Sequence, residues 1–139
     1  MRFRIHGDPV GKARPRVIHR NGKTHTFTPG KTAAYEDAVR LAYLNQCRGG
    51  FFGGEAVRVK MACYYKAPKS DSKKVRAAKL NGEIRPTKKP DCDNVAKCIC
   101  DALNGMAYAD DAQIVELTVE KHYSTIPHVD VEITEAKRP

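Results

Sequence analysis

Two pairs of aspartates are the residues of this sequence whose types and spacing best suit chemistry. Asp91 and Asp93 lie where a loop is expected to become a helix, and they point to similar sides if the chain is still extended there. Asp110 and Asp111 follow further along, just before a strand. Lys97 comes four residues after Asp93 and shares its face of a helix. A helix followed by a returning strand can bring the two acidic pairs together.

Carboxylates gathered at one place repel one another, so they persist only with a cation among them or with raised pKa values. Oxygen-only ligands select Mg²⁺, or Mn²⁺ as a substitute, over zinc. Such a metal orients water and stabilises the charge that develops at a phosphate during hydrolysis. A nearby lysine can stabilise the same charge. The acidic pairs therefore indicate metal-assisted chemistry on a phosphate ester.

Each of these residues also has a structural interpretation. Asp93 can cap a helix, and Asp93 with Lys97 can form an ordinary surface ion pair. Asp110 and Asp111 can belong to a turn. Taken singly, the structural interpretations are favoured. The conjunction of both pairs beside a basic loop gives the catalytic hypothesis equal standing, so the residues alone leave both open.

The charge of the chain is segregated. Its 139 residues carry a formal net charge of +9, but residues 1–31 and 66–90 each carry +7, whereas residues 91–139 carry −6. This distribution indicates a polyanionic partner that meets carboxylates. The alternative is a soluble basic protein with a solvated acidic tail. The residues expected to contact phosphates are Lys12, Arg14, Arg16, Lys73, Lys74, Arg76, Arg85, Lys88 and Lys89.

Composition narrows the class of protein. Apolar residues make up 41% of the chain, which is enough for the core of one domain, expected over residues 1–139. No apolar run is long enough to span a bilayer, and the first residues contain no secretory signal. Five cysteines without such a signal indicate reduced thiols and a cytoplasmic location.

The pattern of apolar residues predicts an α+β fold, in which a mixed β-sheet carries two main helices. The expected helices cover residues 30–47, 73–80 and the stretch from Asp91 or Asp93 to Leu103, and the expected strands cover residues 2–6, 17–19, 25–27, 56–66, 113–123 and 129–133. Thr28-Pro29 and Ser72 are expected N-caps. Asn21-Gly22 predicts a hairpin, and Pro127 with its short connector predicts that the last two strands form another.

Three short motifs follow one another in the second half of the chain. They are Asp91-Cys92-Asp93-Asn94-Val95-Ala96-Lys97, Asp101-Ala102-Leu103-Asn104-Gly105 and Asp110-Asp111-Ala112-Gln113-Ile114. This arrangement closely resembles the RusA family, bacterial and phage endodeoxyribonucleases that resolve Holliday junctions. The segment Gly7-x-Pro9-x-Gly11-Lys12-Ala13-Arg14-Pro15-Arg16 and the later Thr28-Pro29 also look like that family. The resemblance covers nearly the whole chain.

The resemblance implies that Asp91, Asp93 and Asp111 are essential metal-binding carboxylates, with Asp110 as an auxiliary acid and Lys97 as the catalytic lysine. We therefore expect the three essential carboxylates to converge on one ion. The resemblance also implies a Mg²⁺-dependent homodimer with one active site per protomer. Such a dimer makes paired nicks in opposing strands of a four-way junction during DNA recombination and repair.

Two other functions stay open. One is a metal-dependent nuclease with the same active-site residues that cuts other branched DNA, such as flaps or forks. The other is a non-catalytic, basic DNA-binding module whose acidic cluster is structural. The intact set of Asp91, Asp93, Lys97 and Asp111 argues against the second.

Some aromatic and sulfur-containing residues are further candidates. Tyr64, Tyr65 and Tyr108 can stack on DNA bases, although core packing is favoured for Tyr65. Cys98 and Cys100 point about 200° apart on the expected helix, so they cannot chelate one ion together. We interpret both as small buried residues.

Overall fold

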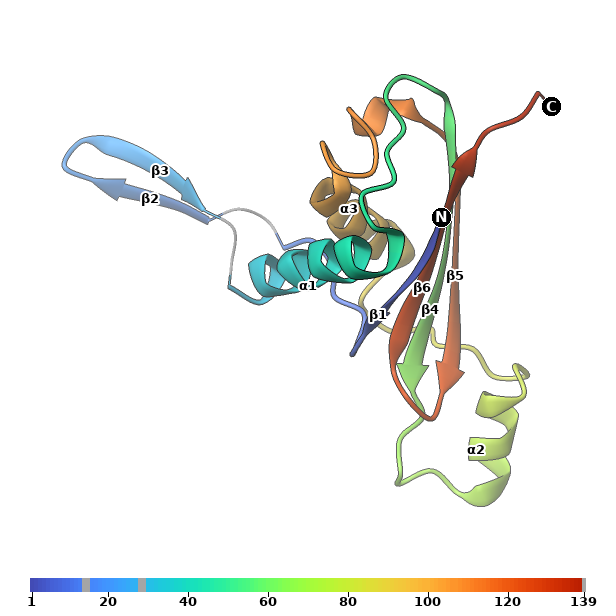
Figure 1. Ribbon diagram of the computed structural model, residues 1–139. Coiled ribbons are helices and arrows are strands. Elements are labelled where there is room, and N and C mark those ends of the chain that lie inside the picture. The colour runs from blue at the N-terminus through green and yellow to red at the C-terminus, as the bar shows by residue number, and fades with distance from the viewer. Residues whose placement is uncertain (14–15, 28–29, 139) are drawn as a thin grey trace.

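A mixed four-stranded β-sheet with α-helices packed on it forms the main part of the fold, as the sequence predicts (Figure 1). The computed structural model describes residues 1–13, 16–27 and 30–138, and all elements below are those of the described residues. The sheet has the strand order β1-β6-β4-β5. Its strands are β1 (Arg2–His6), β4 (Val57–Lys66), β5 (Ile114–Ser124) and β6 (His128–Glu135). The helices are α1 (Gly30–Cys47), α2 (Lys73–Leu80) and α3 (Cys92–Leu103).

β4 is the central strand because one of its faces is continuously apolar. Val57, Val59, Met61, Cys63 and Tyr65 are all buried, and they alternate with half-buried or exposed residues. The strand pairs in parallel with β5 and antiparallel with β6. The strand predicted over residues 56–66 is thereby confirmed.

The predicted hairpin of the last two strands is wrong, because β4 lies between β5 and β6. Val129, Val131 and Ile133 of β6 lie opposite buried residues of β4. Residues 125–127 connect the two strands, and three extended residues span about 10 Å, which is the width of two strand spacings of about 4.8 Å. The connector can therefore pass across one strand. The more apolar β6 takes the interior position, and β5 forms the edge.

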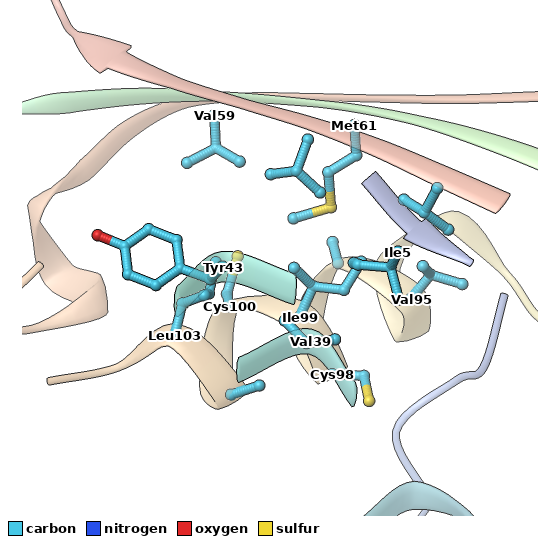
Figure 2. Close-up of a cluster of buried hydrophobic side chains, with 14 of the residues drawn as sticks. Ile5, Val39, Tyr43, Val59, Met61, Val95, Cys98, Ile99, Cys100 and Leu103 are labelled. Carbon is cyan, nitrogen blue, oxygen red and sulfur yellow. The ribbon is translucent and has the colours of Figure 1, made fainter. Parts of the chain in front are cut away.

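The core lies between the sheet and the helices α1 and α3 (Figure 2). Among the residues that the two helices bury are Tyr35, Val39, Tyr43, Val95, Cys98, Ile99, Ala102 and Leu103. Cys98 and Cys100 are both buried, as predicted, and all five cysteines fall within the described residues as free thiols. The sheet thus provides a rigid support for α3, the helix that carries most of the acidic motif.

The helix bounds agree with the capping signals. The predicted range 30–47 for α1 is confirmed, and the left-handed Gly49, at φ +78°, follows its end. Ser72 caps α2 as predicted, because its Oγ accepts a hydrogen bond from Val75 N–H at 3.2 Å. The expected cap at residues 28–29 lies outside the described residues. Within the described ranges, no helix is long and apolar enough to cross a membrane.

A separate two-stranded sheet confirms the first predicted hairpin. It consists of β2 (Arg16–Arg20) and β3 (Lys23–Phe27). Asn21 and Gly22 form its turn with φ angles of 51° and 71°, a left-handed conformation that asparagine and glycine adopt most readily. In Figure 1 this hairpin extends away from the sheet and the main helices.

Candidate active site

A groove beside α3 and the start of β5 gathers most of the residues predicted to be catalytic. Asp93 and Lys97 line it from α3, and Asp111 lines it from the short 3₁₀ turn η1 (Asp111–Gln113). Asp101, to which the sequence assigns no role, lines it as well. The groove has a volume of about 390 Å³ and an apolar side formed by β5.

α3 presents Asp93, Lys97 and Asp101 on one face, because they are four residues apart. Asp93 lies in the first turn of the helix, where the macrodipole favours a carboxylate. The Nζ of Lys97 is 3.5 Å from Oδ2 of Asp101, and the lysine side chain is 63% exposed. An accessible ammonium and two carboxylates therefore face the same groove.

Asp111 is positioned by the end of α3. Its backbone N–H donates a hydrogen bond to Oδ1 of Asn104 at 3.1 Å, so the residue after α3 determines where η1 begins. Asp110 caps that turn, because its Oδ1 accepts from Ala112 N–H at 3.1 Å and its N–H donates to Oε1 of Gln113 at 2.9 Å. Asp110 thus has the turn role that the sequence left open, while Asp111 lines the groove.

The neighbouring carboxyls of Asp110 and Asp111 titrate unequally. A hydrogen bond with Asp110, followed by desolvation and the negative charges of Asp110 and Asp101, raises the pKa of Asp111. The hydrogen bond from Ala112 N–H, followed by the one with Asp111, lowers the pKa of Asp110. The two pKa values are thus shifted in opposite directions, as expected for adjacent carboxylates.

Asp91 does not join this groove, and the expected convergence of Asp91, Asp93 and Asp111 is not found. In the part of the chain that the structure describes, no three His, Cys, Asp or Glu side chains gather closely enough to hold a metal ion. Asp91 instead lines a second pocket together with Lys12. The cause is the start of the helix: Asp91 is the extended N-cap, and Cys92 is already helical. Asp91 and Asp93 therefore lose the common side that an extended chain would give them.

Four carboxylates line this groove, and two of them, those of Asp101 and Glu116, are paired with lysine or arginine. Asp93 and Asp111 supply oxygen ligands, which Mg²⁺ prefers. Mg²⁺ usually keeps several waters and binds one or two protein carboxylates together with substrate phosphates. Asp93 and Asp111 have the donor chemistry for that mode, and the described residues form no group of three side chains that could hold a metal ion.

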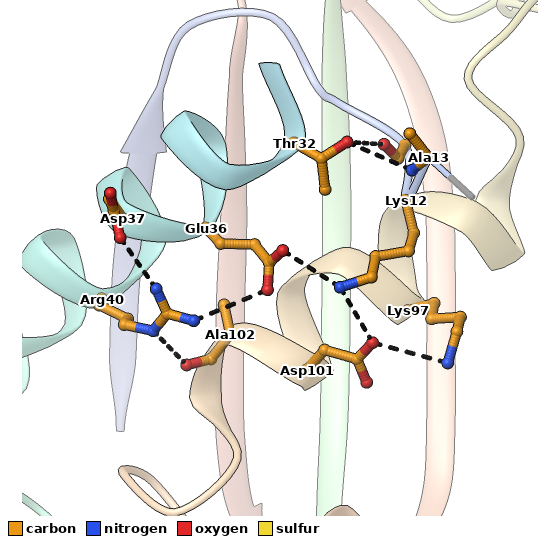
Figure 3. A network of polar contacts seen from close by, with 10 residues as sticks. Lys12, Ala13, Thr32, Glu36, Asp37, Arg40, Lys97, Asp101 and Ala102 are labelled. Atoms are coloured by element: carbon orange, nitrogen blue, oxygen red, sulfur yellow. Dashed lines mark hydrogen bonds and ion pairs between the residues drawn. The ribbon is translucent and has the colours of Figure 1, made fainter. Parts of the chain in front are cut away.

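Lys12, a predicted phosphate contact, lies in an internal ion-pair network (Figure 3). Its Nζ is 3.1 Å from Oε1 of Glu36 and 3.4 Å from Oδ2 of Asp101, and its side chain is only 17% exposed. Glu36 also pairs with Arg40 at 3.7 Å, and Arg40 donates to the carbonyl of Ala102 at 3.1 Å. Burial lowers the pKa of Lys12, but the hydrogen bond and the charge of Glu36 outweigh it and raise that pKa overall. The ammonium stays charged and occupied by two carboxylates.

Four other predicted phosphate contacts are exposed lysines. Lys73 and Lys74 lie on α2, and Lys88 and Lys89 lie in the loop that leads to α3. The Nζ of Lys88 is 5.8 Å from the ring centre of Tyr123, within the range of a cation–π contact. Arg14 and the side chain of Arg16 lie outside the described residues. The lysines in this set remain accessible to an anionic partner.

Two predicted arginine contacts also serve the fold. The Nη1 of Arg76 donates to the carbonyls of Ala67 and Pro68 at 3.1 and 3.4 Å. The Nε of Arg85 donates to the carbonyl of Lys121 at 2.9 Å. The first bonds attach α2 to the segment that follows β4, the last attaches the loop after α2 to β5, and each guanidinium keeps further donors.

Two of the tyrosine candidates are core residues. Tyr108 is fully buried, and its hydroxyl donates to the carbonyl of Cys100 at 2.7 Å, so stacking on a base is wrong for this residue. Tyr65 is buried as well and donates to the carbonyl of Pro90 at 2.7 Å, which confirms core packing. Tyr64 is half-buried on the other face of β4.

Asp101, Asn104 and Gln113 support the groove, although the sequence assigns them no role. The Nε2 of Gln113 donates to the carbonyls of Phe52 and Glu55 at 3.1 and 3.0 Å, which ties η1 to the segment before β4. All three residues stand inside the motifs quoted above. Polar side chains at helix ends and turns commonly form hydrogen bonds with nearby backbone groups. The positions of Asn104 and Gln113 in the sequence could therefore have predicted such bonds.

An acidic groove with an accessible lysine, beside exposed basic residues, suits chemistry on a phosphate ester of a polyanion. The family model described as Endodeoxyribonuclease RusA matches residues 6–134. A protein of Bacillus subtilis (strain 168), the uncharacterized protein YqaN, is 40% identical over 137 residues, which make up 97% of this chain and 96% of that protein. The chain belongs to the RusA family of endodeoxyribonucleases, which confirms the resemblance and implies nuclease activity.

Proposed function

We propose that this protein is a Mg²⁺-dependent endonuclease that acts as a homodimer on branched DNA and resolves four-way junctions by paired nicks. The observation that carries the proposal is the groove shared by Asp93, Lys97 and Asp111. Membership of the RusA family supports it. The preference for a junction, the metal and the dimer are what the proposal adds to the family assignment.

The groove residues divide the work between metal binding and charge stabilisation. Asp93 and Asp111 are the residues that would hold Mg²⁺, which when bound polarises a phosphate and activates water for hydrolysis. Lys97 can place its exposed ammonium against phosphate oxygens, where negative charge increases in the transition state. Asp91 and Asp110 are also predicted metal ligands, although Asp91 lines the second pocket, the one that contains Lys12.

The exposed lysines account for binding rather than cleavage. Lys73, Lys74, Lys88 and Lys89 can contact phosphates irrespective of base sequence. Phosphate contacts fix the register and orientation of a protein on DNA. Binding and chemistry therefore depend on different residues and should be separable by mutation.

A homodimer follows from the symmetry of the substrate. A four-way junction has two-fold symmetry, and its resolution needs two nicks in matched positions. Within the described residues of one chain, Asp93 and Asp111 line a groove together with Lys97, and this set occurs once. Two copies related by a two-fold axis would supply the second site.

The experiment compares Asp93→Asn with the wild type on a synthetic four-way junction. We expect cleavage in Mg²⁺ to fall at least about 100-fold, because the groove loses one of its two metal-binding charges. Junction affinity, measured without Mg²⁺, should hold or rise because a negative charge is removed beside the phosphates. Asp8→Asn is the matched control, since it makes the same charge change at an exposed residue of the N-terminal loop.

Three results would contradict parts of this proposal. Cleavage by Asp93→Asn at nearly the wild-type rate would show that this carboxylate stabilises the start of α3 and takes no part in catalysis. Faster cleavage of flaps or forks than of four-way junctions would show that the protein acts on another class of branched DNA. A monomeric mass at micromolar concentration, together with only singly nicked cruciform plasmid, would leave a structure-selective nickase.

A further inference from the structure

The carboxylate of Asp101 lies between two ammonium groups that come from different parts of the chain (Figure 3). Its Oδ2 is 3.4 Å from the Nζ of Lys12 and 3.5 Å from the Nζ of Lys97. Lys12 comes from the loop before the first hairpin, whereas Lys97 belongs to the same helix as Asp101. One oxygen therefore connects the interior of the protein with the exposed lysine of the groove.

Helix stability does not explain Asp101. The residue lies in the last turn of α3, where the macrodipole disfavours a carboxylate. A lysine four residues before an acid is also the less stabilising order for such a pair on a helix. Lys97 and Asp101 stand in that order. A carboxylate at this position would therefore add little to the stability of an isolated helix.

The interior side of the network holds Asp101 in place. The side chains of Lys12 and Glu36 are 17% and 10% exposed, so their charges are largely shielded from water. Lys12 is fixed further by its own backbone N–H, which donates to the carbonyl of Asn94 on α3 at 3.0 Å. Arg40 closes the network through Glu36. Asp101 therefore offers its oxygen to Lys97 from a fixed position.

We propose that Asp101, held by Lys12, is a positioning residue that keeps the ammonium of Lys97 directed over the groove containing Asp93 and Asp111. This inference rests on the proposed function, because it concerns the lysine that acts there. Lys97 is 63% exposed and would otherwise sample many rotamers. A charged group held near its reacting position contributes far more to a rate than one that must be ordered during each turnover.

The competing explanation is that Asp101 only neutralises the buried Lys12. Glu36 already lies closer to that ammonium, at 3.1 Å compared with 3.4 Å. Neutralisation predicts that removing the Asp101 charge lowers stability and changes nothing specific to Lys97. Positioning predicts a loss in the cleavage step that exceeds any loss in folding or binding.

The first experiment measures single-turnover cleavage of a four-way junction, junction affinity without Mg²⁺, and the melting temperature. We expect Asp101→Asn to cleave roughly 2- to 5-fold more slowly, because an exposed ion pair raises the population of the positioned ammonium by no more than that, with junction affinity unchanged. Asp101→Glu keeps the charge but moves it by one methylene, so it should lose less. Asp37→Asn is the control, because Asp37 pairs with Arg40 on the far side of the same network.

A rate within twofold of the wild type for Asp101→Asn would overturn the proposal, and so would a lowered melting temperature without a slower cleavage step. If Asp101→Asn does not fold, Asp101→Glu decides. A reproducible decrease in its cleavage rate, with an unchanged melting temperature, supports positioning, and an unchanged rate overturns it.

A second experiment needs neither metal nor DNA. Trace acetylation with acetic anhydride, read by mass spectrometry, compares Lys97 with the exposed Lys73 in the folded protein. Loss of its carboxylate partner should make Lys97 react about 1.5- to 5-fold faster in Asp101→Asn, the range that an exposed ion pair corresponds to. Unchanged acetylation would overturn the proposal even if cleavage were slow. If the wild type cleaved no junction at all, the proposed function would fail, and acetylation would still test the contact.

Discussion

The two lysines at the start of α2 allow a quantitative test of how this protein holds DNA. Lys73 and Lys74 are exposed, whereas the nearby Arg76 is bonded to backbone carbonyls. We expect the double variant Lys73→Gln/Lys74→Gln to bind a four-way junction more weakly at low salt. It should also be less sensitive to added salt, because fewer counterions are released from the phosphates.

The size of the effect follows from the number of contacts. Each neutralised phosphate contributes about 0.9 to the slope of log affinity against log salt concentration, so two lysines contribute about 1.8. Between 50 and 200 mM salt, the affinity of the wild type should therefore fall by roughly tenfold more than that of the double variant. Lys12 should add little to this slope, since Glu36 and Asp101 already occupy its ammonium.

Fluorescence anisotropy of a labelled junction without divalent metal, at four or five salt concentrations, gives both slopes. The control is Lys60→Gln, which removes one positive charge from the pocket on the outer face of the sheet that also contains Glu120, Asp130 and Glu132, so the two variants are compared per charge removed. An unchanged slope for the double variant would show that α2 does not contact phosphates. An equal change in slope per charge removed for Lys60→Gln would show that overall charge, rather than the position of Lys73 and Lys74, governs binding.

Two further predictions concern the interior. Tyr108→Phe should lower the free energy of unfolding by about 1–3 kcal/mol in urea denaturation, because the carbonyl of Cys100 loses its donor. Tyr123→Phe should change little, since its hydroxyl makes no hydrogen bond with the described residues, and equal losses would refute the argument. Burial raises the pKa of the Cys63 thiol to about 12 and that of Cys98 to about 11, from an ordinary value of 9.0. Because the folded state keeps these thiols protonated, their contribution to the free energy of unfolding is complete below about pH 9. It is lost as the pH rises toward 11–12, and each thiol lowers the free energy of unfolding by at most about 1.4 kcal/mol per pH unit. Urea denaturation from pH 8 to 11 should show this decline and a shallower one in Cys98→Ala, and identical slopes would contradict the assignment.

The parts of the fold that the sequence predicts well depend on interactions between residues close in the chain. The range of α1 follows from apolar spacing and from the glycines after Cys47. The hairpin around Asn21 and Gly22 follows from their tolerance of positive φ. The alternation in β4 follows from the two faces of a strand. Each signal lies within a few residues of the feature that it predicts.

The parts that the sequence does not predict depend on distant partners or on a single helical residue. The β5–β6 hairpin is wrong because β4, more than forty residues earlier, takes the place between the two strands. Lys12 resembles a surface cation in sequence because its partners, Glu36 and Asp101, come from two helices further along the chain. The side chains of Asp91 and Asp93 point to different sides because α3 begins at Cys92, between them. They would share a side only if the chain were still extended there.

The strand order has a consequence for how the protein is made. Every hydrogen-bonded pair in the four-stranded sheet includes β5 or β6, which lie between residues 114 and 135. A nascent chain that has reached residue 113 already contains Asp93, Lys97, Asp101 and Asp111, yet β1 and β4 still have no partner in this sheet. Pairing across such long sequence separations is slow, because the loop must close before its contacts form. Of the groove's charged residues the last strands contribute only Glu116, but the ribosome must release both strands before the groove can be assembled.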